Sequence, residues 1–135
     1  MSSKLDVCLV ESGIIGSDIN QNLENIYNKL KNLRNVDLRV LPETFDKGFN
    51  FPPKNIHDFK NNPSILWMKT LAREKQCAIC GSLMVKENDN IFNRFIFYDN
   101  VNFFVTAKSD EFSKKVKYWL EINKEIRLVN LRSNV

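Results

Sequence analysis

The amino-acid sequence predicts an α/β fold in the element order βαβαββ, with helices on one face of a mixed sheet. Short apolar segments bounded by turn residues alternate with segments in which apolar residues recur every three to four positions. Of the 135 residues, 43% are hydrophobic and 27% are charged, which is the balance of an ordinary globular domain. A chain of this length is therefore expected to form one domain with a single core.

The first βα unit is predicted near the amino terminus. Residues 5–10, LDVCLV, are short and apolar, which is typical of a buried strand. Asp18 followed by Gln21 is a capping-box pattern that predicts the start of a helix. Residues 36–40 alternate apolar and polar side chains and end before Pro42, which cannot donate a ladder hydrogen bond. The helix between the two strands has apolar residues at helical spacing: Ile19, Leu23, Ile26, Leu30 and Leu33.

A second helix and two further strands follow. Residues 63–75 form the predicted helix, with Asn62 as its cap and proline at its first position. Residues 77–85 and 91–98 are predicted strands, and the polar residues 86–90 form the connection between them. The order to this point is βαβαββ.

The pattern weakens towards the carboxyl terminus. Residues 101–105 are a candidate strand, 109–123 an amphipathic helix and 126–131 a short last strand. We therefore divide the chain into a half domain over 1–99 and a continuation over 100–135 that holds a helix and a short strand. The sequence does not fix how strands pair after Asp99.

Composition and charge favour a cytoplasmic protein with no nucleic-acid or membrane role. No run reaches the roughly 18 to 20 apolar residues that cross a bilayer, and the start has too short an apolar stretch for a secretory signal. The net charge is +4, and the lysines near the carboxyl terminus alternate with acids and apolar residues, as on a solvated helix face. Three cysteines cannot pair completely, so we expect reduced thiols. Cys77 and Cys80 fall in a predicted strand, which favours buried core thiols over a redox site.

The segment LPETFDKGF, Leu41 to Phe49, directly follows the second predicted strand. It resembles a motif of the nitrilase superfamily, the carbon-nitrogen hydrolases, and the closest likeness is to the omega-amidase branch, which hydrolyses small linear amides. The resemblance implies that residues 1–99 form a nitrilase-like amino-terminal half domain, part of an α-β-β-α sandwich. Further landmarks have a similar order and spacing: Trp67-Met68, Gly81-Ser82 and Asn93-Arg94.

The resemblance implies a catalytic set of cysteine, glutamate and lysine. In this family a cysteine thiolate attacks the amide carbonyl, a glutamate transfers the proton and a lysine stabilises the oxyanion, with no metal or organic cofactor. Glu43 stands at the general-base position. Asn100 stands at the weakly matched lysine position, where a neutral amide cannot supply charge. No cysteine stands at the nucleophile position, because Cys8, Cys77 and Cys80 lie in other predicted strands.

These departures leave three hypotheses. The first is a truncated or degenerate carbon-nitrogen hydrolase homologue, a pseudoenzyme that is inactive alone. The second is a non-catalytic module that pairs with itself or with a complete family member through an exposed sheet face. The third is an unrelated α/β domain with an accidental match, which a fold without Glu43 at a strand end would favour. The sheet face of the second hypothesis is predicted to include Val7, Leu9, Val40, Ile79, Leu83 and Ile96.

Overall fold

The computed structural model describes residues 4–16, 18–33, 35–48, 56–105 and 125–131, and it confirms the predicted α/β fold. The predicted helix over 109–123 lies outside the described residues. The elements are, in chain order, β1 (Lys4–Val10), α1 (Ile19–Leu30), β2 (Leu38–Val40), α2 (Pro63–Lys75), β3 (Ala78–Glu87), β4 (Asn90–Tyr98), β5 (Phe103–Val105) and β6 (Glu125–Leu131).

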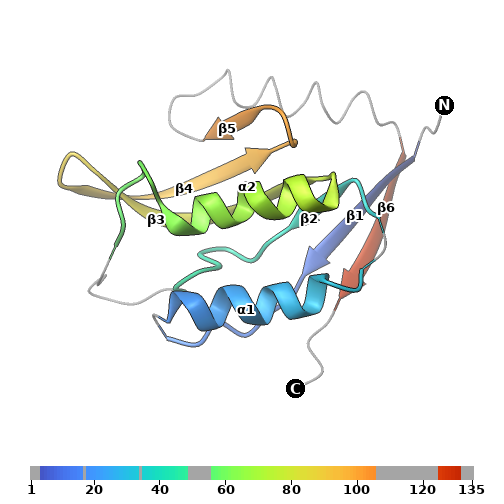
Figure 1. Cartoon of the computed structure of the whole chain (residues 1–135), viewed down its shortest axis with the longest axis horizontal. Helices are drawn as coiled ribbons and strands as arrows, with labels where there is room; N and C mark the ends of the chain where they lie inside the picture. The colour runs from blue at the N-terminus through green and yellow to red at the C-terminus, as the bar shows by residue number, and fades with distance from the viewer. Residues whose placement is uncertain (1–3, 17, 34, 49–55, 106–124, 132–135) are drawn as a thin grey trace.

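The described strands form one mixed sheet in the order β5-β4-β3-β2-β1-β6. β1 pairs in parallel with β2 and β6, and β2 pairs in parallel with β3, whereas β3, β4 and β5 are antiparallel. β6 lies beside β1 over its whole length, from Lys4 opposite Glu125 to Val10 opposite Leu131 (Figure 1). The sheet therefore contains strands from both sides of residue 99. The division of the chain into 1–99 and 100–135 stays a prediction.

Both helices begin at the predicted caps. Asp18 accepts a hydrogen bond from the backbone N–H of Gln21 at 3.1 Å, and Asn62 accepts from those of Ser64 and Ile65 at 2.9 and 3.3 Å. These side chains satisfy N–H groups that the first helical turn leaves without partners. Within the described parts of the chain, no helix is long and apolar enough to cross a membrane.

Two apolar clusters lie on opposite faces of the sheet. The larger one lies between the sheet and both helices, which cover the same face (Figure 1). The smaller one lies on the other face, which we call the far face, and its buried members are Leu5, Val7, Leu38, Ala78, Cys80 and Phe97.

The predicted membership of the far face is partly wrong. Val7 and Val40 do belong to it, and Leu9 follows by alternation along β1. Ile79, Leu83 and Ile96 instead pack under the helices. In these central strands both faces are apolar, so the alternation that normally tells the two faces apart is absent from the sequence.

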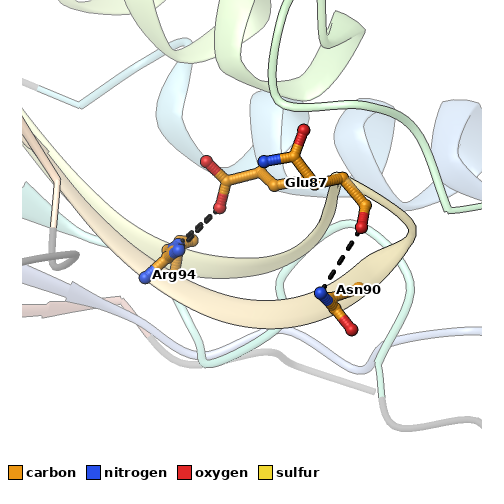
Figure 2. Close-up of polar contacts among 4 residues, drawn as sticks. Glu87, Asn90 and Arg94 are labelled. Atoms are coloured by element: carbon orange, nitrogen blue, oxygen red, sulfur yellow. Dashed lines mark hydrogen bonds and ion pairs between the residues drawn. The ribbon is translucent and has the colours of Figure 1, made fainter.

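The hairpin between β3 and β4 is tighter than predicted. The strands extend to Glu87 opposite Asn90, and a two-residue turn, Asn88-Asp89, joins them with φ of 50° and 65°. Positive φ at both central residues is the turn geometry that matches the twist of the paired strands. Figure 2 shows Arg94 directed at Glu87 beside this turn. Arg94 Nε and Nη2 donate to Glu87 Oε2 at 2.9 and 2.7 Å.

Candidate functional site

Glu43 lies at the carboxyl end of β2, as predicted for the motif. The chain stays beside β3 just past the strand, because Leu41 N–H donates to Cys80 O at 2.8 Å. This close approach requires a glycine in β3: a Cβ at Gly81 would lie 2.9 Å from Leu41 Cβ and 3.2 Å from Phe45 Cδ1. The Gly81-Ser82 landmark of the sequence thus has a steric role beside the glutamate.

Ser82 fixes the turn that follows Glu43. Its hydroxyl accepts from Thr44 N–H at 3.1 Å, and its backbone carbonyl accepts from Phe45 N–H at 3.3 Å. Thr44 has φ of 46°, a conformation that non-glycine residues rarely adopt, and Gly48 N–H donates to Thr44 O at 2.7 Å to close the turn. β3 therefore sets the position of the glutamate through both the side chain and the backbone of one serine.

A buried polar network supports the other side of the turn. Ser64 Oγ, in the first turn of α2, donates to Asp46 Oδ2 at 2.7 Å, and Asn22 Nδ2, on α1, donates to Asp46 O at 2.7 Å. Burial raises the pKa of Asp46, against the opposing effects of the Ser64 hydrogen bond and the Lys47 charge. Sequence reasoning missed this network. The feature that could have revealed it is a polar residue at a buried position of each helix, Asn22 in α1 and Ser64 in α2.

Glu43 faces a cavity of about 350 Å³ between the end of β2 and the middle of β3 and β4. Asn93 Nδ2 donates to Glu43 Oε1 at 3.1 Å, so an amide from β4 orients the carboxylate, which is solvent-exposed. A carboxylate oriented in this way can accept a proton from, or a hydrogen bond of, a molecule in the cavity. The lining residues are Leu41, Glu43, Gly81, Ser82, Asn93 and Phe95.

The three cysteines are free and buried, which confirms the prediction of core thiols for Cys77 and Cys80. Burial raises the pKa of Cys8 and Cys77 above the usual thiol value, and it raises the pKa of Cys80 to about 12. The thiolate is the nucleophilic form, so burial of this kind makes a cysteine unreactive. None of the three is among the residues that line the Glu43 cavity.

Asn100 lies in the turn between β4 and β5, with φ of 79°. Asp99 Oδ1 accepts from the backbone N–H groups of Val101 and Asn102 and so holds this turn. Asn100 is not among the lining residues of the cavity, and its own Oδ1 is buried with no hydrogen-bond partner. The structure does not bring it to Glu43, and its match to the lysine position stays a prediction. Among the described side chains there is also no group of three or more His, Cys, Asp or Glu that could hold a metal ion.

A family profile described as carbon-nitrogen hydrolase matches residues 12–119, which include Glu43, its turn and the whole cavity lining. The chain belongs to the carbon-nitrogen hydrolase family. This membership confirms the resemblance drawn from LPETFDKGF and excludes an accidental match. Comparison with curated proteins returns no match.

Solved carbon-nitrogen hydrolases share the fold. A CN-hydrolase superfamily protein of Xanthomonas campestris, XC1258, whose structure has an arsenic adduct in its active site, is 24% identical with a TM-score of 0.68. The match covers 94% of this chain and 46% of that one. N-terminal amidase with a Gln-Val peptide is 12% identical with a TM-score of 0.64, over 91% of this chain and 30% of that one. The chain therefore spans less than half the length of these proteins.

Proposed function

We propose that this chain supplies the glutamate of a carbon-nitrogen hydrolase site and does not hydrolyse amides by itself. One contrast supports the proposal: Glu43 is oriented at a strand end towards a cavity, whereas all three cysteines are buried away from the residues that line it. Amide hydrolysis in this family needs both a proton-transferring carboxylate and a thiolate at the same carbonyl carbon. The described lining of the cavity includes a carboxylate and no thiol, which supports the proposal.

On this proposal the chain is a truncated or degenerate family member, and the substrates of a complete site are small linear amides of the omega-amidase type. Glu43 would accept the proton of the attacking nucleophile, with Asn93 fixing the direction of its carboxylate. We infer a cytoplasmic location, which three free cysteines support.

Ammonia release from a panel of small omega-amides tests the proposal. The purified protein is assayed beside a Glu43→Ala variant and a sample of the folded protein treated with a thiol-alkylating reagent. We expect no release from any of them. Release by the native protein that both treatments abolish would mean that Cys8, Cys77 or Cys80 has been recruited as nucleophile, and would overturn the proposal.

A second candidate function is association through the far face. Two apolar side chains that point to this face are exposed, Leu9 by 38% and Ile91 by 44%. Exposed apolar groups on a sheet face favour contact with another protein surface. We propose a second copy of the chain, or a complete family member, as the partner. Light scattering during size-exclusion chromatography tests self-association: a defined oligomer supports it, and a monomer over a wide concentration range contradicts it.

A further inference from the structure

We propose that the Glu43 cavity of this chain binds a small primary ammonium group, such as the cationic end of an aliphatic amine. The inference goes beyond amide hydrolysis, because it concerns reversible binding by the chain as it stands and involves no covalent step.

Charge is the first argument. Of the described residues that line the cavity, Glu43 is the one that carries a charge, and its carboxylate accepts a hydrogen bond from the neutral amide of Asn93 at 3.1 Å. Neither the ion pair of Lys86 with Asp89 nor that of Arg94 with Glu87 includes Glu43. The cavity therefore has a net negative lining that a cationic ligand would neutralise.

The second argument is the balance of hydrogen-bonding groups. A primary ammonium has three N–H donors and no acceptor. Three acceptor atoms belong to residues that line the cavity: Glu43 Oε2, the side-chain oxygen of Asn93, and the hydroxyl oxygen of Ser82, which keeps a lone pair after accepting from Thr44 N–H. Asn93 directs its amide hydrogen at Glu43, so this contact leaves the Asn93 oxygen for the ligand.

The third argument is the apolar part of the lining. Phe95 lines the cavity and contributes aromatic surface to it. Leu41 offers an aliphatic surface for a short alkyl chain. A volume of about 350 Å³ lies in the range of small-molecule sites.

The test is a titration with n-butylammonium followed by NMR chemical shifts of the backbone amides. Glu43→Gln keeps the size of the side chain and an oxygen for Asn93, and because Glu43 is solvent-exposed the fold tolerates the change. Glu74→Gln is the matched control, since it removes the same charge from an exposed position of α2. We expect shifts at Ser82, Asn93 and Phe95, an affinity about fivefold weaker in Glu43→Gln, and an unchanged affinity in Glu74→Gln.

Two further ligands separate charge from hydrogen bonding. Tetramethylammonium carries the charge without N–H donors, and n-butanol carries the alkyl chain without the charge, so both should bind more weakly than n-butylammonium. Equal binding by Glu43→Gln, equal binding of tetramethylammonium, or no shifts around the cavity would each overturn the proposal. The measurement involves no turnover, so its failure is distinct from that of the proposed function.

Discussion

Arg39 is a charged residue in the interior of the protein. It is one of the polar residues in the alternating segment 36–40, and it is fully buried in β2. Its Nη1 donates to Cys77 Sγ at 2.7 Å, and its Nε has no partner. Burial of a guanidinium without an opposite charge is costly. A polar residue can be buried at this position because a central strand of a mixed sheet is covered on both faces.

Replacement of Arg39 by methionine should therefore stabilise the fold. Arg39→Met removes a buried charge and the unpartnered Nε while it keeps an unbranched apolar chain in place of the arginine stem. We expect the free energy of unfolding in urea to rise by about 1 to 3 kcal/mol. The control is Arg94→Met, which removes the same charge from the ion pair with Glu87 and should lower stability by up to about 1 kcal/mol. A lower free energy of unfolding in Arg39→Met would contradict this expectation, because it would show that the contacts of Arg39 outweigh the cost of burying its charge.

The buried thiols make stability depend on alkaline pH. Burial raises the pKa of Cys80 from its usual 9.0 to about 12 in the folded chain. Between these values the unfolded chain loses a proton that the folded chain keeps, so the stabilisation is complete below about pH 9 and is lost as the pH rises towards 12. We expect stability to fall by about 1.4 kcal/mol per pH unit from this group alone. Urea unfolding at several pH values should show a shallower fall in Cys80→Ala, and an identical fall in both proteins would contradict the assignment.

At the scale of elements, local signals predicted most of the fold. Asp18 and Asn62 fixed both helix starts because cap side chains satisfy N–H groups a few residues away. The end of α1 at Leu30, rather than Leu33, was missed because Leu33 packs on the core from beyond the helix. The pairing of β6 with β1 could not be predicted, since parallel strands so far apart in the chain share no turn.

The contact between β3 and the end of β2 can be tested at Gly81. Gly81→Ala places a Cβ 2.9 Å from Leu41 Cβ, so the chain leading to Glu43 has to move. We expect a loss of about 1 to 3 kcal/mol in the free energy of unfolding, and changed NMR shifts at Thr44 and Asn93. Gly13→Ala is the matched control, because a Cβ there meets nothing within 4 Å. If both variants were equally stable, the close approach of the two strands would not constrain the glutamate.

At the scale of the whole molecule, the candidate site joins the end of β2 to the β3–β4 hairpin, which follows it in the chain only after α2. The motif predicted Glu43, but its contact with Asn93 joins residues 50 positions apart, and it depends on the β3–β4 register that a two-residue turn sets. Ser82 and Asn93 were noted in the sequence only as positions that match the family. In the structure, Ser82 accepts a hydrogen bond from Thr44 N–H and Asn93 donates one to Glu43. Physical reasoning from one sequence finds residues that carry a motif; it does not find the partners that only the sheet order brings to them.

The far face provides the molecular-scale prediction. Leu9 on β1 and Ile91 on β4 both point away from the helices, near opposite sides of the sheet, so a surface that binds a second copy across this face would include both. Leu9→Lys with Ile91→Lys would bring two ammonium groups into such a contact, where unpaired charges are costly. We expect the mass measured by light scattering to fall to that of a monomer. Leu66→Lys changes an apolar residue that is 54% exposed on α2, on the helix side of the sheet, and should leave the mass unchanged. If Leu66→Lys dissociated the oligomer and the double variant did not, the contact would lie over the helices, and the sheet face would have no part in association.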